Sequence, residues 1–265
     1  MPIDILGNVI SSSSFDAGSS PGTLNNIVTD GLNCHLDPGN YTSYPGTNES
    51  TTSIYSAGTT IYDMSGYGSN ANLYDFSWNS FNGYNWYNGT ASNSGGIQLP
   101  LTNFVKTQGT FEIWAYPTSW SDSNGLFMNR DDSTANAVDW WWLGGWNSGG
   151  TLYFRLGDGS TCCNNDLTVG SWSSVHPTNT WGHYVVTWVS GGYSKIYFNG
   201  KLKNSRSIST IPGTNPSVNG RIGLGHGNGT SRWLGYLSAS RFYSRPLSSI
   251  EIYQNWLATK GRYGQ

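Results

Sequence analysis

The sequence has little charge. Charged residues make up 11% of its 265 residues, and thirteen Lys and Arg stand against fifteen Asp and Glu, for a net charge of -2. Neutralising nucleic-acid phosphates requires a basic surface, so this composition excludes a nucleic-acid-binding protein that works by bulk electrostatics. The sequence also lacks any apolar run near the roughly 20 residues that a transmembrane helix needs. It therefore predicts no membrane-spanning helix.

Cysteine is scarce as well. The three cysteines are Cys34 and the adjacent Cys162 and Cys163, which supply no disulfide framework for a chain of this size. Adjacent cysteines bridge only through a strained ring, so we expect all three to be reduced. Residues 1–10 have neither the basic region nor the long apolar core of a secretory signal. We expect the chain to stay in the compartment where it is made, or to leave it inside an assembled particle.

Aromatic residues and glycine, in contrast, are abundant. Aromatics reach 15%, with thirteen Trp and seventeen Tyr, and there are thirty-five Gly. Large rings bury enough area to exclude a disordered chain. Glycine destabilises helix interiors and supports turns. The composition predicts a turn-dense, all-β protein.

Alternation of apolar and polar residues, which places one set toward the core and the other outward, predicts most of the strands. The predicted strands are 33–37, 59–63, 111–116, 184–189, 195–198, 201–203, 220–225 and 235–243. Asn199-Gly200 between two of them is a strong hairpin signal, because both central residues of a type I′ turn need positive φ. One helix is expected from about 248 to 259, with Gly261 as its stop. Its apolar stripe is Ile250, Tyr253, Trp256 and Leu257.

The chain has no internal repeat, which favours a single domain over residues 31–260. We expect residues 1–30 to form an N-terminal arm and linker, because 11–23 are almost entirely small and polar. Residues 261–265 are expected to be a short C-terminal tail.

Four segments of the second half together resemble the laminin-G-like (concanavalin A-like) jelly-roll family. They are 109–117, 181–188, 195–200 and 235–252. The resemblance implies an all-β, two-sheet antiparallel jelly-roll sandwich with one short C-terminal helix. The chain departs from the family at Ser238 and Ala239, where Asp and Glu usually follow in the last strand. Any ligand role of those positions is therefore in doubt here.

The N-terminal part is similar to the start of laminin-G-like proteins of marine bacteriophages of the cyanophage type. Segments 31–46 and 61–70 carry this resemblance. Such proteins are mostly virion components, such as capsid decorations, knobs, and tail or fibre parts. The resemblance implies a virion protein made in the host cytoplasm.

Carboxylates in the pattern of a glycosidase are missing. Jelly-roll glycosidases place two carboxylates on one strand face, to serve as acid and nucleophile or base. The three glutamates are Glu49, Glu112 and Glu251, and none has an acidic partner at strand spacing. Glu112 alone lies on a predicted strand, either as a lone carboxylate in a cleft or as an outward polar residue. We expect no enzymatic activity.

Calcium is an open alternative, and no other cofactor is expected. Laminin-G-like domains often hold one Ca²⁺ at the rim of the sandwich through carboxylate and carbonyl oxygens. Asp131 and Asp132, in a loop after a strand, are the best candidates as ligands. The alternative is that these residues are simply turn formers.

Two aromatic clusters are candidates for binding glycans or partner proteins. The first is Trp140-Trp141-Trp142 with Trp146, and on a strand Trp141 would face opposite to its two neighbours. At least one indole would then point away from the core, and an exposed indole can stack on a sugar or anchor an interface. Alternatively, sheets and loops cover both faces. The second cluster is Tyr84, Trp86 and Tyr87, in a loop-rich region. The candidates for binding are Trp141 and Trp146 from the first cluster and Trp86 and Tyr84 from the second.

These observations lead to two functional hypotheses. The first is a non-enzymatic structural protein of a bacteriophage virion, a capsid decoration or a tail or fibre component, with other virion proteins as partners. The alternative is a carbohydrate-binding lectin module that recognises a surface polysaccharide of the host. The two are compatible, since a decoration can also adhere to glycans. Homo-oligomerisation stays open.

Overall fold

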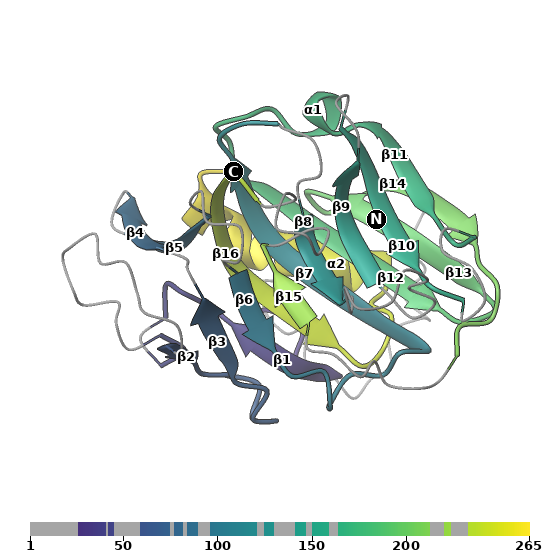
Figure 1. Cartoon of the computed structure of the whole chain (residues 1–265), viewed down its shortest axis with the longest axis horizontal. Coiled ribbons are helices and arrows are strands. Elements are labelled where there is room, and N and C mark those ends of the chain that lie inside the picture. Colours follow the sequence, from purple (N-terminus) through teal and green to yellow (C-terminus); the bar gives the residue numbers. More distant parts are fainter. Residues whose placement is uncertain are drawn as a thin grey trace, which may run out of the picture.

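The computed structural model describes residues 26–40, 42–44, 59–74, 77–81, 84–89, 96–120, 125–129, 141–146, 150–158, 164–212, 220–223 and 233–265. For Thr59, Tyr74, 77–81, 84–89 and Trp146 the description covers the backbone. Two antiparallel sheets of eight strands each face one another (Figure 1). The all-β sandwich with a C-terminal helix, expected from the sequence, is confirmed.

We call one sheet the helix-side sheet, because helix α2 packs on its outer face. Its strand order is β14-β13-β12-β7-β16-β5-β4, and β1 also pairs with β16. The bounds are β1 Leu32–Leu36, β4 Ser77–Phe81, β5 Tyr84–Gly89, β7 Gln108–Pro117, β12 Gly182–Val189, β13 Tyr193–Phe198, β14 Lys201–Ser207 and β16 Gly235–Tyr243. Strand β16 is central, since β7 runs along one side while β5 and β1 share the other.

The other sheet is the opposite sheet, with the order β11-β10-β9-β8-β15-β6-β3-β2. Its bounds are β2 Thr59–Ile61, β3 Ala71–Tyr74, β6 Gly96–Leu99, β8 Gly125–Asn129, β9 Trp141–Trp146, β10 Thr151–Leu156, β11 Leu167–Ser171 and β15 Gly220–Ile222. Strands distant in sequence pair within it. For example, Arg221 of β15 pairs with both Gln98 of β6 and Met128 of β8.

The core lies between the two sheets. On β7, Phe111, Ile113 and Ala115 point into it, while Glu112 and Trp114 lie on the outer face. Fully burying one large apolar side chain stabilises the fold by roughly 1.5–3 kcal/mol, so this layer dominates stability. The inward residues of β7 are thus one of the two alternating sets in the predicted strand 111–116.

The predicted hairpin is confirmed in detail. Asn199 and Gly200 have φ of 50° and 73°, which are the positive values that a type I′ turn requires. They connect β13 to β14, which pair antiparallel.

Helix α2, Ser249–Thr259, lies on the far side of the strands in Figure 1, in yellow. Ser248 and Glu251 form a capping box at its start, where each side chain accepts the other's backbone N–H. The predicted apolar stripe is wrong at Ile250, which is 75% exposed. Ile252 and Asn255 are buried instead. Asn255 faces the sheet, where its buried amide has a hydrogen-bonding partner in Glu112.

Two helical turns were not predicted: α1, Trp172–Val175, and the 3-10 turn Lys260–Tyr263. The second overlaps the predicted C-terminal tail, residues 261–265. Tyr263 is 4% exposed and stacks on Trp114, with ring centroids 3.9 Å apart. Its hydroxyl lies 2.9 Å from the Ser238 Oγ. Apolar area and a hydrogen bond thus fix these residues on the helix-side sheet. Within the described ranges, no helix has the length and apolarity to cross a membrane.

Candidate functional site

Glu112 was the one glutamate expected on a strand, and the structure places it at the centre of a buried network. Its register partner on β16 is Arg241, whose Nη1 donates to Glu112 Oε1. His183 Nε2 of β12 lies 3.1 Å from the same oxygen. Asn255 of α2 donates to Oε2 at 2.6 Å. Glu112 is fully buried between the sheet and the helix.

The surroundings of Glu112 favour the ionised carboxylate. Burial alone would raise the pKa of this carboxyl, but the charge of Arg241 and the contacts with His183 and Asn255 outweigh it and lower the pKa to about 2. A general acid at neutral pH needs a raised pKa and access to substrate. Glu112 has neither, so the arrangement is suited to holding the helix on the sheet. Glu112 is also the only carboxylate residue in any described strand.

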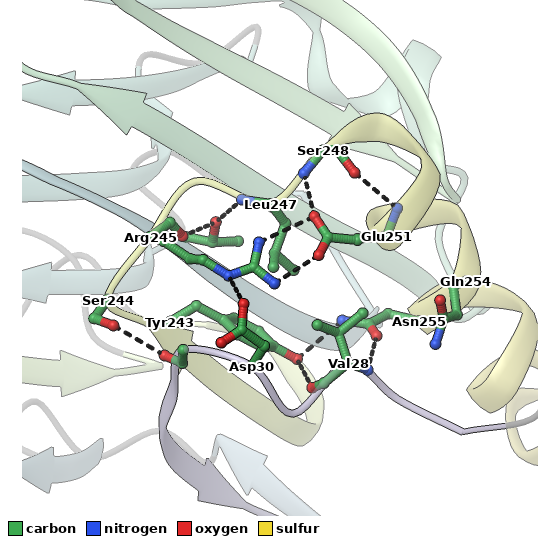
Figure 2. Close-up of polar contacts among 12 residues, drawn as sticks. Val28, Asp30, Tyr243, Ser244, Arg245, Leu247, Ser248, Glu251, Gln254 and Asn255 are labelled. Carbon is green, nitrogen blue, oxygen red and sulfur yellow. Dashed lines mark hydrogen bonds and ion pairs between the residues drawn. The ribbon is translucent and has the colours of Figure 1, made fainter. Parts of the chain in front are cut away.

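The network continues along the outer face to the N-terminal part of the described chain (Figure 2). Val28 N donates to Asn255 Oδ1 at 2.8 Å, and the Tyr243 hydroxyl donates to Val28 O at 3.2 Å. Nearby, Arg245 forms a two-bond fork with Glu251 at 3.1 and 2.6 Å and reaches Asp30 at 2.7 Å. The helix-side sheet is thus closed at this place by α2 and residues 26–30.

The outer face of the opposite sheet carries half-buried polar side chains in register. Asn72 of β3 pairs with Gln98 of β6, which pairs with Arg221 of β15. Their chain neighbours Leu73, Ile97 and Ile222 are in the core, so these three side chains lie on the outer face. We call Asn72, Gln98 and Arg221 the polar row.

An aromatic pair continues this face beyond the polar row. Across β8 and β9 the register leads to Trp142, and then to Arg155 on β10. The rings of Trp142 and Tyr153 are nearly parallel, at 6.2 Å and 6°. The Arg155 guanidinium lies 5.6 Å from the Trp142 ring and donates twice to Asp166, at 2.6 and 2.5 Å. Trp142 is buried, whereas Tyr153 is half-buried.

The polar row offers amide donors and acceptors and one guanidinium, and the half-buried ring of Tyr153 lies farther along the same face. Ligand sites typically combine a few fixed polar groups with aromatic surface. Sugars present hydroxyls that donate and accept together with apolar ring faces, which matches this combination.

Trp141 is a correction, because it is not an exposed candidate for glycan binding. Its side chain is 1% exposed and packs in the core, with ring centroids 5.2 Å from Trp188 and 6.5 Å from Phe127. Trp141 and Trp142 do face opposite sides of β9, as alternation requires. The inward side belongs to Trp141, because the pairing of β9 with β8 and β10 turns that side toward the helix-side sheet.

The other predicted candidates do not gather at one place. Trp146 ends β9 in the opposite sheet, while Tyr84 and Trp86 belong to β5 in the helix-side sheet. Asp131 and Asp132 lie outside the described residues. In the part of the chain that is described, no three His, Cys, Asp or Glu side chains form a group able to hold a metal ion. The calcium site stays a prediction.

The polar row was missed at the level of sequence. Asn72, Gln98 and Arg221 each stand before a buried Leu or Ile within a strand of three or four residues. A single polar residue in so short a segment is a weak signal, and only the strand pairing brings the three together.

The fold is shared with several solved structures at low sequence identity. Domain 4 of AbnA, an extracellular arabinanase from Geobacillus stearothermophilus solved with arabinotriose, is 17% identical, with coverage of 84% of this chain and 97% of that chain and a TM-score of 0.59. The botulinum neurotoxin serotype D binding domain is 18% identical, with coverage of 88% and 53% and a TM-score of 0.61. A third structure belongs to botulinum neurotoxin type C, whose cell entry depends on interaction with two ganglioside molecules. It is 16% identical, with coverage of 87% of this chain and 52% of that chain and a TM-score of 0.58.

The chain thus spans about half the length of the neurotoxin structures and nearly all of the arabinanase domain. Identities at this level establish a common fold. A comparison with curated protein sequences gives no match. A family model matches residues 88–253, more than half of the chain. The chain belongs to the concanavalin A-like lectin/glucanase superfamily, in its laminin-G-like branch.

Proposed function

We propose that this chain is a carbohydrate-binding module that holds a saccharide on the outer face of the opposite sheet and does not hydrolyse it. The observation that carries the proposal is the polar row, three hydrogen-bonding side chains in register on the face that also carries the half-buried ring of Tyr153. The likeness to an arabinanase domain solved with arabinotriose supports the same class of ligand.

The network around Glu112 supports a binding role over catalysis. Glycoside hydrolysis by the common routes needs two carboxylic groups flanking the bond, one of them protonated. Glu112 is ionised, neutralised by Arg241 and covered by α2. Asp166, just before β11, is engaged by Arg155.

A glycan array followed by calorimetry tests the proposal. We expect the full chain to bind at least one saccharide with a Kd in the millimolar to micromolar range. Gln98→Ala and Arg221→Ala each remove a hydrogen-bonding side chain, worth about 1–3 kcal/mol, so affinity should fall by about 5- to 150-fold. Lys203→Ala is the matched control, since it removes an exposed side chain from β14 of the other sheet.

Two results would overturn the proposal. One is an array on which the folded chain binds no saccharide. The other is saccharide binding that Gln98→Ala and Arg221→Ala leave as strong as in the Lys203→Ala control. Release of reducing ends from a bound polysaccharide would contradict the non-catalytic part alone. The virion role implied by the sequence resemblance stays a separate prediction, tested by cosedimentation of the chain with particles that lack it.

A further inference from the structure

The loop between β2 and β3 is held rigidly by one carboxylate. Asp63 Oδ1 accepts the backbone N–H groups of His35 and Ser65, both at 2.8 Å. Its Oδ2 accepts the Ser65 hydroxyl at 2.6 Å and the Ser69 N–H at 3.0 Å. With four donors, the carboxylate ties the loop to strand β1, and its charge is taken up inside the loop.

This rigid loop exposes an aromatic ring. Tyr67 is 62% exposed, more than any other aromatic side chain whose burial is described. A Cβ placed on Gly66 or on Gly68, the chain neighbours of Tyr67, would meet no atom within 4 Å apart from their own neighbours in the chain, so the backbone before and after Tyr67 is open. A ring on a fixed backbone loses little conformational freedom when it binds a ligand, which favours affinity.

Hydrogen bonds to this loop also orient two exposed amides, Asn103 and Asn70. Asn103 donates to Tyr67 O and to Ser69 Oγ, both at 3.2 Å, so its side-chain oxygen is left to accept. Asn70 accepts from Asp63 N at 2.9 Å, so its NH2 group is left to donate. Asn103 is itself held by Asn33, whose side-chain amide donates to the backbone carbonyl of Asn103 at 2.6 Å.

The charge of this surface selects the class of ligand. Residues 62–70 and 101–105 contain no Lys or Arg, and their single carboxylate is the saturated Asp63. Within these two described segments, an anionic ligand would find no cation. A neutral saccharide needs only a ring to stack on and amides to hydrogen-bond its hydroxyls.

We propose that Tyr67, Asn70 and Asn103 form a second saccharide contact, specific for neutral sugars and separate from the polar row. The class of ligand rests on the proposed carbohydrate-binding function, whereas the place and its preference for neutral sugars rest on the loop. The polar row contains Arg221 and tolerates anionic sugars. The contact formed by Tyr67, Asn70 and Asn103 does not bind anionic sugars.

The test compares variants of the full chain on an array of neutral and anionic glycans, with calorimetry on the neutral glycans that bind. Tyr67→Ala should weaken binding of neutral glycans at least tenfold and leave anionic glycans unchanged. Tyr67→Phe keeps the ring and should stay within about threefold of the wild type. Tyr62→Ala is the matched control, because it removes another exposed tyrosine, 45% exposed, from the same loop. Thermal unfolding should be the same for all three, since these rings are outside the core.

A second readout locates the contact. In saturation-transfer NMR, neutral glycan protons should receive less magnetisation from Tyr67→Ala than from Gln98→Ala when each is irradiated at aromatic frequencies. Unchanged binding by Tyr67→Ala, with loss in Gln98→Ala, would overturn the second contact and leave the proposed function standing. Absence of glycan binding by the wild type would overturn both. Equal losses in Tyr67→Ala and Tyr62→Ala would also overturn the specific role of Tyr67.

Discussion

Replacing Glu112 with Gln tests whether the buried network holds the fold together. Gln has nearly the same size but no charge, so Arg241, 2% exposed, would stay buried without its counter-charge. Removing one partner of a buried ion pair costs about 3–5 kcal/mol. The pKa of Glu112 gives a similar figure. It falls from 4.5 to about 2 in the folded state, and at about 1.4 kcal/mol per pH unit this corresponds to roughly 3 kcal/mol.

The sign of the pH dependence follows from the direction of this shift. The pKa of Glu112 is lower in the folded chain than in the unfolded chain. Its contribution to stability is therefore complete above about pH 4.5 and is lost as the pH falls toward 2. The wild type should lose this contribution in that window, and Glu112→Gln has none to lose. The two unfolding curves should approach each other in acid.

Urea unfolding followed by tryptophan fluorescence at pH 7 and pH 3 measures both effects. Glu251→Gln is the matched control, because its pair with Arg245 is about one quarter exposed and glutamine is accepted in a capping box. We expect a loss below about 1 kcal/mol for this control. Equal urea midpoints for Glu112→Gln and wild type at pH 7 would refute the reasoning, as would a difference that stays constant between pH 7 and pH 3.

Three further predictions concern the core and the backbone. Burial lowers the pKa of His176 to about 4, and its Nδ1 lies 2.6 Å from the Tyr184 hydroxyl. The wild type should therefore lose stability as the pH falls from 6.5 to 4. Over the same pH range, the urea midpoint of His176→Gln should decline less steeply. Trp141→Ala should cost about 3–5 kcal/mol in chemical unfolding, whereas a surface ring would cost little. Gly235→Ala should lower stability by about 2 kcal/mol or more, measurable as a fall in Tm, because the new Cβ would lie 2.0 Å from Tyr116 O at a φ of +134°.

Elements with local signals were predictable from the sequence. Strand β7 alternates cleanly because one face meets the core and the other meets a helix layer with polar contacts. The hairpin at Asn199-Gly200 and the start of α2 at Ser248 depend on turn and cap chemistry within a few residues. Such signals survive whatever the rest of the chain does.

The middle of the opposite sheet gave no such signal. Strands β8 and β9 carry large apolar side chains on both faces, such as Phe127 and Met128 or Trp141 and Trp142, so the alternation of apolar and polar residues is erased. In Trp141-Trp142, the sequence shows that the two rings oppose each other but cannot show which one faces the core. That choice depends on pairing with β8 and β10.

The candidate site was unpredictable for a related reason. Asn72, Gln98 and Arg221 come from three strands far apart in the sequence, and β15 supplies the link by pairing with both β6 and β8. Asn103 and Tyr67 likewise meet only through side-chain hydrogen bonds between two loops. Charge in the sequence pointed to Glu112, yet the fold uses that charge to hold α2.

Under the proposed function, the two outer faces of the sandwich have different tasks. On the helix-side sheet, the charges of Glu112 and Arg241 are satisfied internally and covered. Such a pair contributes less to stability than its Coulomb energy suggests, because both ions lose water, but it fixes where the helix sits. On the opposite sheet, Gln98 and Arg221 keep part of their surface exposed. Glu112→Gln should thus reduce stability and leave saccharide affinity intact wherever the variant is folded. Gln98→Ala should reduce affinity and leave stability intact, and loss of both properties in either variant would show that the two faces are coupled.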